Sequence, residues 1–462
     1  MKQIQKIENL LVEQVVNEGK CISRHEGMVI FTEQTVPGDI VDVELYRKKK
    51  SYAEGRVINF QKRGPAYIKP FCKHFDWCGG CRWQQLAYTE QLAAKQRLVM
   101  ELLQQIGKTD LPEPMPIIGS QKTTHYRNKL DYTFSNLRWF ETADQTAAEN
   151  KNALGFHIPQ RFDRVLDIET CFLMDDMQNR IKNDLRNYVL QHGLEFFDLR
   201  KQEGLLRNLI IRNTSTGQWM VIICFARNDE KEIKGILNFL LQRFPEITTL
   251  QFVINTKRND TISDQEVITY SGPGYIVEKL GELKFKISPK SFFQTNSFQA
   301  KRLYDVVKDF AGLSGKELVY DLYTGTGSIA NYVADSAKKV VGLEYVEQAI
   351  EDAKENSKLN EISNTIFLAG DMVKLLTADF FEQHGMPDVI ITDPPRTGMH
   401  ADVVKQILNA APGRIVYVSC NAATQARDLE LLAAKYRVIK IQPVDMFPHT
   451  AHVENVLLLE LK

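Results

Sequence analysis

The sequence contains no long apolar run. A membrane-spanning helix needs about 18 or more consecutive apolar residues, and no stretch of the chain approaches that length. The segment from Met1 to Gly19 is polar and contains acidic residues, so it lacks the apolar centre of a signal peptide. We therefore expect a cytoplasmic protein that does not contact a membrane.

The sequence also lacks an excess of one charge, because 58 Lys and Arg residues are matched by 58 Asp and Glu residues. This balance excludes the strong overall positive charge that many nucleic-acid-binding proteins carry, and it leaves only local basic patches. The patches are Arg47–Lys50, Lys62-Arg63 and His125–Lys129, with tyrosines in or beside two of them. Each is compatible with contacts to nucleic-acid phosphates and also with a solvated surface.

Cysteine is scarce, with seven in 462 residues, and a reducing cytoplasm makes disulfides unexpected. Cys72, Cys78 and Cys81 form a C-x5-C-x2-C group, and Cys171 lies far downstream. Four thiolates suit either a zinc ion or a cubane iron-sulfur cluster. The spacing lacks the two short C-x2-C pairs of a zinc ribbon, which favours an iron-sulfur cluster over zinc or unliganded thiols.

Internal repeats and low-complexity tracts are absent, and the length predicts about two to four domains. Residues 5 to 60 form short stretches that alternate apolar and polar residues between turns, which predicts a small β-barrel. Leucines at helical spacing predict a helix over Gln84–Gly107. The strands expected in the barrel are Ile7–Val12, Gly27–Phe31, Ile40–Tyr46 and Tyr52–Phe60.

From Gly315 onward, short apolar strands alternate with amphipathic helices, which predicts an α/β fold with a mostly parallel, doubly wound sheet. No long helix separates the last two strands, so we expect an antiparallel hairpin at one edge. We place the domains at 1–62, 63–285 and 286–462. The expected strands are Leu318–Leu322, Val340–Tyr345, Ile366–Ala369, Val389–Thr392, Ile415–Ser419, Arg437–Gln442 and Val453–Leu461.

A glycine-rich loop, Asp321–Ser328, follows the first strand of this sheet and opens a helix. Glu344 ends the next strand, where a carboxylate can accept hydrogen bonds from both ribose hydroxyls of a nucleotide. The loop also fits a loose dinucleotide pattern, so nicotinamide cofactors remain an alternative. Asp393-Pro394-Pro395-Arg396 closes the fourth strand, and its two prolines predict a rigid wall beside the cofactor.

Cys420 follows the fifth strand, and Glu454 lies at the start of the last. Because the last strand is expected to be antiparallel, its beginning lies level with the end of a parallel neighbour. A thiol and a carboxylate at one rim fit base methylation, in which a thiolate adds to carbon 6 of uracil and a base later removes the proton of carbon 5. The alternatives are a cysteine that packs as a small apolar side chain and a solvated glutamate.

These motifs resemble those of the bacterial RNA uracil-5-methyltransferases that act on 23S ribosomal RNA, and the resemblance covers nearly the whole chain. It rests on a TRAM-like N-terminal segment, the four cysteines and a series of short motifs. The motifs are Tyr126–Lys129, Ser288–Asn296, Asp321–Gly327, Asp393–Arg396, Ser419–Asn421 and His452–Glu454.

The resemblance implies a class I Rossmann-like methyltransferase domain, an OB-like TRAM barrel that binds RNA and a central α+β iron-sulfur domain. It implies that Cys420 is the nucleophile and Glu454 the base, and that the protein is a monomer that modifies 23S ribosomal RNA. The S-adenosylmethionine site would consist of Gln294, Tyr323, Glu344 and Asp393. The ligands of a [4Fe-4S] cluster would be Cys72, Cys78, Cys81 and Cys171.

Three other functions fit parts of the sequence. The catalytic motifs are equally compatible with the same chemistry on transfer RNA. A radical S-adenosylmethionine enzyme would need a C-x3-C-x2-C loop that leaves one iron open, whereas here a fourth cysteine is available to close the site. A non-catalytic RNA-binding iron-sulfur protein would leave Cys420 and Glu454 without a role.

Overall fold

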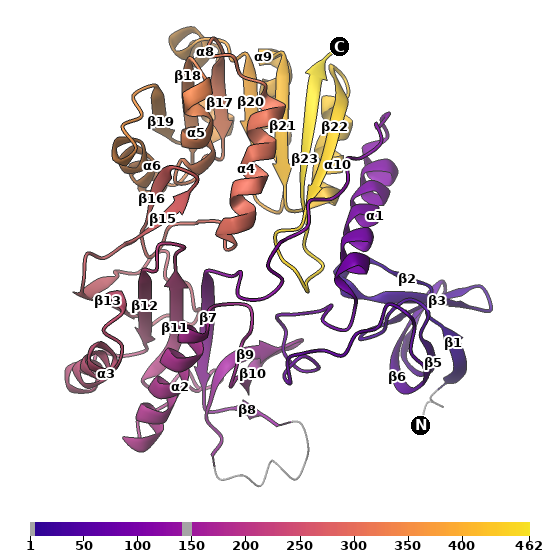
Figure 1. The fold of residues 1–462 in the computed structure, drawn as a ribbon, viewed down its shortest axis with the longest axis vertical. Coiled ribbons are helices and arrows are strands. Elements are labelled where there is room, and N and C mark those ends of the chain that lie inside the picture. The colour runs from indigo at the N-terminus through magenta and orange to yellow at the C-terminus, as the bar shows by residue number, and fades with distance from the viewer. Residues whose placement is uncertain (1–4, 141–149) are drawn as a thin grey trace.

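The computed structural model describes residues 5–140 and 150–462. Figure 1 shows an N-terminal β-domain, a central domain built on a large sheet, and a C-terminal domain above both. The N-terminal sheet has the order β1-β5-β6-β4-β3-β2, and its apolar side chains enclose one core around Ile30, Val41 and Val43. Its strands are β1 (Lys6–Leu11), β2 (Gln14–Val15), β3 (Cys21–His25), β4 (Met28–Thr32), β5 (Ile40–Lys48) and β6 (Tyr52–Lys62).

The central domain contains an eight-stranded sheet of order β14-β13-β12-β11-β7-β9-β10-β8. The middle strands β11 and β12 are almost wholly buried, and in β11 this burial includes Arg207, Asn208 and Arg212. The strands are β7 (Lys129–Ser135), β8 (Arg138–Trp139), β9 (Ala153–Ile158), β10 (Arg161–Asp167), β11 (Leu206–Asn213), β12 (Trp219–Phe225), β13 (Ile247–Ile254) and β14 (Ile268–Ser271). The helices are α2 (Asp176–Gln191) and α3 (Glu230–Arg243).

The C-terminal sheet has seven strands in the order β19-β18-β17-β20-β21-β23-β22. The first five are parallel, and β23 is antiparallel to both neighbours. The predicted mostly parallel sheet with an antiparallel edge hairpin is thus confirmed. The strands are β17 (Leu318–Leu322), β18 (Lys339–Glu344), β19 (Thr365–Ala369), β20 (Val389–Thr392), β21 (Arg414–Ser419), β22 (Tyr436–Val444) and β23 (Glu454–Leu461).

Helices cover this sheet on both faces, as expected of a doubly wound fold. They are α4 (Ser297–Ala311), α5 (Ser328–Val333), α6 (Glu347–Leu359), α7 (Met372–Leu375), α8 (Ala378–His384), α9 (Ala401–Ala410) and α10 (Ala422–Leu432). Within the described ranges, no helix is long and apolar enough to cross a membrane.

The helix α1 (Tyr88–Gly107) precedes the central sheet in the chain but packs on the C-terminal domain, beside α10 in Figure 1. Leu103 belongs to the same buried cluster as Leu429 of α10. The helix begins at Tyr88 rather than at the predicted Gln84, because a turn in which Leu86 N–H donates to the Trp83 carbonyl precedes it.

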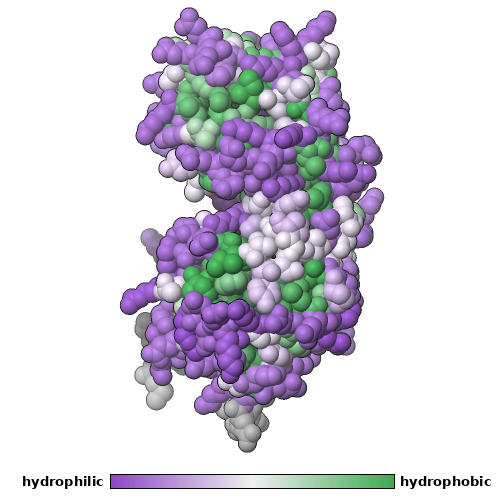
Figure 2. Space-filling model, turned by 90° about the vertical axis from the view of Figure 1, so that its left-hand side faces the viewer, coloured by the Kyte–Doolittle hydropathy of each residue, from purple (hydrophilic) through white to green (hydrophobic). Residues whose placement is uncertain are grey.

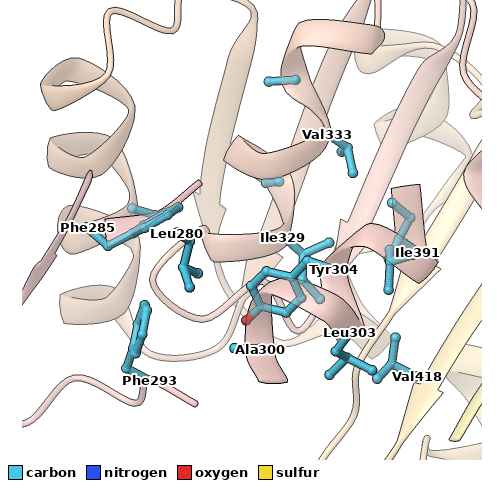
Figure 3. Close-up of a cluster of buried hydrophobic side chains, with 14 of the residues drawn as sticks. Leu280, Phe285, Phe293, Ala300, Leu303, Tyr304, Ile329, Val333, Ile391 and Val418 are labelled. Atoms are coloured by element: carbon cyan, nitrogen blue, oxygen red, sulfur yellow. The ribbon is translucent and has the colours of Figure 1, made fainter. Parts of the chain in front are cut away.

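The core does not stop at the junction between the central and C-terminal domains. A hairpin of β15 (Ile276–Leu280) and β16 (Leu283–Ile287) shares one apolar cluster with α4, α5 and the C-terminal sheet. In Figure 3 the ring of Tyr304 lies beside Ile329 within this cluster. Figure 2 shows a narrower waist between the two lobes on one face of the molecule. The waist therefore lies over a continuous apolar core.

Candidate active site

The loop between β17 and α5 bends sharply at the carboxyl end of β17. Tyr323, Gly325 and Gly327 all have positive φ, at 63°, 55° and 73°, and a tyrosine in that region costs backbone strain of the kind found at functional sites. A Cβ added to Gly325 would meet nothing within 4 Å, whereas one on Gly327 would come within 2.9 Å of Ala353 Cβ. Gly327 is thus required by packing, and Gly325 leaves open space above its backbone.

Asp321 lies beneath this loop and is almost fully buried. Its Oδ2 accepts hydrogen bonds from Thr324 Oγ1 and from Ala330 N, the latter at 3.1 Å. Its Oδ1 is buried without a partner among the described residues. Burial raises the pKa of Asp321 to about 7, and the charges of Asp393 and Glu344 act in the same direction. A buried, half-satisfied carboxyl is costly away from a ligand site.

Glu344 ends β18 and faces the open space at Gly325. Its Oε2 accepts from Gly325 N at 3.2 Å, and its Oε1 accepts from the N–H groups of Tyr345 and Val346 at 2.9 and 3.1 Å. Three backbone donors therefore fix the direction of the carboxylate. The ring of Tyr345, the next residue, is largely exposed.

The two other residues predicted for the cofactor, Gln294 and Asp393, come from other segments of the chain. Asp393 follows β20, and burial raises its pKa. Gln294 is buried in the segment just before α4, where Asn128 Nδ2 donates to its carbonyl at 3.0 Å. The four predicted cofactor residues thus come from the segment just before α4 and from the carboxyl ends of β17, β18 and β20.

The predicted nucleophile and base leave the sheet at one rim. Ser419 pairs with Asn455 in the antiparallel β21–β23 ladder, so Cys420 and Glu454 each lie one residue beyond that pair. Burial raises the pKa of Cys420 to about 11, and the charges of Glu454 and Asp393 raise it further while Arg396 lowers it. Burial also raises the pKa of Glu454, with Asp393 adding to the effect and Arg396 opposing it. Asp393 and Arg396 thus act electrostatically on both Cys420 and Glu454.

Arg396 and His452 form a contact across this rim that the sequence did not predict. Arg396 Nη2 donates to His452 Nδ1 at 3.3 Å. Arg396 ends the Asp-Pro-Pro-Arg wall, and His452 lies two residues before Glu454. The contact thus joins the end of β20 to the start of β23 beside the thiol, and Arg396 is the cation that acts on both Cys420 and Glu454.

A cavity of about 620 Å³ runs from this rim to the central domain. Arg396 and His452 line it together with all four predicted cluster cysteines. Three cations and an exposed aromatic ring also line it: Arg127, Lys129, Arg212 and Phe292. Cationic walls with an exposed ring suit a single RNA strand with a displaced base.

The environment of the four predicted cluster cysteines disfavours free thiolates. Burial raises the pKa of Cys78 and Cys81 to about 12 and that of Cys171 to about 11, and the neighbouring thiol charges raise each further. Gly80 N–H points at Cys78 Sγ at 3.4 Å, a contact that stabilises a thiolate. A nearby group of positive charge would favour the thiolate forms of these cysteines against burial and against one another. Within residues 5–140 and 150–462, no three His, Cys, Asp or Glu side chains are arranged to hold a single metal ion.

One buried ion pair behind the site gave no sequence signal. Lys95 of α1 and Asp445 after β22 are both fully buried, with Lys95 Nζ 2.6 Å from Asp445 Oδ1. Lysine on a helix is usually exposed, and these partners are 350 positions apart in the chain. Only an alignment showing that the two vary together could have paired them from sequence.

The chain is similar throughout to known RNA methyltransferases. The profile of the tRNA (uracil-5-)-methyltransferase family matches residues 87–462, and that of the TRAM domain matches residues 2–58. A protein of Bacteroides thetaiotaomicron named as an uncharacterized RNA methyltransferase is 55% identical, over 96% of this chain and 99% of its own length. A protein of the same name from Porphyromonas gingivalis is 53% identical, over 96% of this chain and 97% of its own.

A solved structure is similar over the whole length. The tRNA (uracil-54, C5)-methyltransferase of Pyrococcus abyssi, in complex with S-adenosyl-L-homocysteine, matches with a TM-score of 0.76 and 26% identity. The match covers 97% of this chain and 100% of that one. The family profile, the relatives and this structure agree with the predicted TRAM segment, α/β methyltransferase fold and methyl donor. The chain therefore belongs to the tRNA (uracil-5-)-methyltransferase family and is an S-adenosylmethionine-dependent RNA (uracil-5-)-methyltransferase.

Proposed function

We propose that this enzyme methylates carbon 5 of a specific uridine in 23S ribosomal RNA, with Cys420 as the nucleophile and Glu454 as the base. The observation that carries the mechanism is the Ser419–Asn455 pair, which brings Cys420 and Glu454 to one rim beside Asp393. Glu454 is buried there and Cys420 is half-buried, and the charge of Arg396 favours the charged forms of both.

The reaction follows from these positions. The Cys420 thiolate adds to carbon 6 of the uracil, and the electron pair of the carbon 5–carbon 6 double bond moves into an enolate. Carbon 5 then attacks the sulfonium methyl group and releases S-adenosylhomocysteine. Glu454 removes the remaining proton of carbon 5, the double bond re-forms and the carbon–sulfur bond to Cys420 breaks. The target base has to leave its stack to reach the thiol.

Gln294, Tyr323, Glu344 and Asp393 would hold the methyl donor. Glu344, oriented by three backbone N–H groups, suits the two ribose hydroxyls. The open space over Gly325 leaves room for the ligand to approach the backbone. Asp321, with one buried unpaired oxygen, supports the loop from below.

Cys72, Cys78, Cys81 and Cys171 would hold a [4Fe-4S] cluster, which when bound contributes folding free energy to the surrounding loops. We assign residues 1–62 to an RNA-binding barrel, 63–285 to the central iron-sulfur domain and 286–462 to the catalytic domain. We propose that the enzyme works as a monomer in the cytoplasm.

Transfer RNA is the second candidate substrate. The Pyrococcus abyssi structure, whose own substrate is named as a tRNA uracil, covers the barrel, the central domain and the catalytic domain together. The assignment to 23S ribosomal RNA rests on the motif resemblance of the cysteine group and the barrel. The two substrates are distinguished by incubating the enzyme and labelled methyl donor with purified ribosomal RNA and transfer RNA that lack the modification. Label in 23S RNA alone supports our proposal, and label in transfer RNA alone replaces it.

The mechanism is tested with Cys420→Ser. Serine has no accessible anion near neutral pH, so methylation should fall by at least about a thousandfold. Binding of S-adenosylmethionine should stay within about twofold, because Cys420 faces the uracil. A serine variant with turnover comparable to the parent would rule out covalent catalysis at this residue.

A further inference from the structure

The loop 445–453 connects β22 to β23 and ends at Glu454. Its first residue, Asp445, is the buried partner of Lys95 on α1. Removing two charges from water is so costly that buried ion pairs often add nothing to stability compared with apolar residues of the same size. Such a pair is better explained by a need for one defined geometry.

Asp445 is held from every side. Its Oδ1 accepts from Lys95 Nζ at 2.6 Å and from Phe447 N at 3.1 Å, and its Oδ2 accepts from Tyr88 Oη at 2.7 Å. Its own N–H donates to the carbonyl of Ile118, and its carbonyl accepts from Gln299 Nε2, both at 2.9 Å. A residue with all its polar groups paired cannot move without leaving some of them unpaired.

Hydrogen bonds from α1 and from Tyr126 fix the rest of the loop. Lys95 Nζ donates a second hydrogen bond to the Phe447 carbonyl at 3.0 Å, and Tyr126 Oη donates to the Pro448 carbonyl at 3.0 Å. Gln91, one turn before Lys95 on α1, accepts from His449 N at 2.8 Å. His449 has a φ of 65°, a strained conformation that persists because these contacts hold it.

Asp445 lies next to the residue that pairs with Glu454. Val444 pairs with Glu454 in the β22–β23 ladder, and Asp445 directly follows Val444. We propose that Lys95 and Asp445 are positioning residues that fix this turn and thereby direct the Glu454 carboxylate at carbon 5 of the methylated uracil. This inference rests on the proposed function of Glu454. Lys95, which lies on α1 outside the methyltransferase sheet, would thus control proton removal, the last chemical step.

The charge of Lys95 lowers the pKa of His449 and His452, but it does not act on the pKa of Glu454 itself. The groups that shift the pKa of Glu454 are Asp393 and Arg396. Loss of the Lys95 charge should therefore slow proton removal without moving the pH at which it becomes fast. A displacement of about 1 Å at a reacting group can cost about a hundredfold in rate, so the expected effect is a tenfold to hundredfold slower release of product.

The test compares Lys95→Met with Arg207→Met. Arg207 is also a buried cation, and it holds the distant loop 255–260 by donating to the carbonyls of Asn255 and Asn259 at 2.9 and 3.1 Å. Both variants lose a buried charge of similar size. RNA containing 5-fluorouridine has no proton to remove at carbon 5, so it reports addition and methyl transfer alone. Ordinary RNA reports those steps and release together.

We expect Lys95→Met to form the 5-fluorouridine adduct at a rate within about threefold of the parent. On ordinary RNA it should accumulate a denaturant-resistant, methyl-labelled adduct that decays at least about tenfold more slowly than that of the parent. Asp445→Asn should show the same split, and it serves as the second variant if Lys95→Met does not fold. Arg207→Met should release product like the parent.

Parent-like release by Lys95→Met or by Asp445→Asn would overturn the inference. It would also fail if the Lys95→Met, Asp445→Asn and Arg207→Met variants slowed adduct formation and release equally, because the pair would then serve stability alone. A parent enzyme that forms no adduct with 5-fluorouridine RNA would contradict covalent catalysis itself, and the proposed function would fall together with this inference.

Discussion

Ser419 and Asn455 are the last paired residues of the β21–β23 ladder. Gln425 of α10 fixes this end of the ladder, because its Nε2 donates to the Tyr417 and Asn455 carbonyls at 2.9 and 3.2 Å and its Oε1 accepts from Asn455 Nδ2 at 2.8 Å. The two strands run in opposite directions, so the residue after one and the residue before the other emerge on the same side. The rim that holds Cys420 and Glu454 is therefore set by backbone pairing and by one buried amide.

Glu454→Gln should separate methyl transfer from product release. Glutamine retains the shape of glutamate but has no basic site, so the methylated uracil should stay bonded to Cys420. A denaturing gel with labelled methyl donor should show an adduct at early time points, with turnover at least about a hundredfold below the parent. Asn455→Asp is not a suitable control because Asn455 is buried, so the comparison uses Glu460→Gln, a half-exposed residue at the far end of the same strand that pairs with Arg437. Parent-like turnover of Glu454→Gln without an adduct would mean that another group is the base.

Glu344→Gln should weaken binding of S-adenosylmethionine by about tenfold to a hundredfold, because a hydrogen bond to a charged acceptor contributes about 1.5–3 kcal/mol. Calorimetric titration of the enzyme with the methyl donor measures the loss. Glu347→Gln, an exposed residue in the first turn of the next helix, is the matched control and should bind normally. Equal affinities in the two variants would remove Glu344 from the cofactor site.

Much of the C-terminal fold could be predicted because its signals are local. The strands Leu318–Leu322 and Val389–Thr392 have the predicted bounds, since short apolar runs between turns mark buried strands. The position of Cys420 and Glu454 at the same end of neighbouring strands followed from strand direction alone. These features need only the residues of one strand and the order of the elements.

The features that escaped prediction depend on partners far apart in the chain. Lys95 lies on a helix whose periodicity says nothing about a carboxylate after β22. The hairpin β15–β16 joins the core of the C-terminal domain although most of it, from Ile276 on, lies before the predicted start of that domain at residue 286. Which apolar face meets which is decided by tertiary packing, and a single sequence does not contain that information.

Cys78→Ser should abolish iron binding. Anaerobically purified parent protein should be brown and contain about four iron atoms per chain, whereas the variant should be colourless and less stable. Cys224→Ala, which changes a buried cysteine of β12 outside the cavity, should keep its iron. Colourless parent protein with one zinc ion per chain by elemental analysis would decide for zinc.

Acid should destabilise the protein through His449. Burial lowers its pKa to about 4 from an ordinary value near 6.5, so between these values the unfolded chain binds a proton that the folded chain does not. The stabilising effect of the neutral ring is complete above about pH 6.5 and is lost as the pH falls toward 4, which amounts to at most about 3 kcal/mol.

The measurement is the difference in unfolding free energy between the parent and His449→Asn at several pH values. Asparagine tolerates the positive φ of this position but does not titrate. The parent should lose its advantage over the variant as the pH falls from 6.5 to 4. A difference that stays constant with pH would show that His449 titrates normally.

Arg396 should control the reactivity of Cys420. Its positive charge lowers the pKa of the Cys420 thiol against the raising effects of burial, Glu454 and Asp393. Arg396→Met removes that charge, so the pKa should rise and less thiolate should be present at any pH below it. Because each unit of pKa changes the thiolate fraction tenfold, we expect alkylation of Cys420 at about pH 8 to slow by about threefold to tenfold, and the pH profile to move to higher pH.

The rate of Cys420 alkylation is followed by mass spectrometry of the peptide that contains Cys420, without RNA. Arg127→Met removes a cation from the same cavity that does not act on this thiol, and it should leave the profile in place. Equal shifts in the two variants would mean that the cavity's overall charge, and not the Arg396 side chain beside the thiol, sets the reactivity of Cys420.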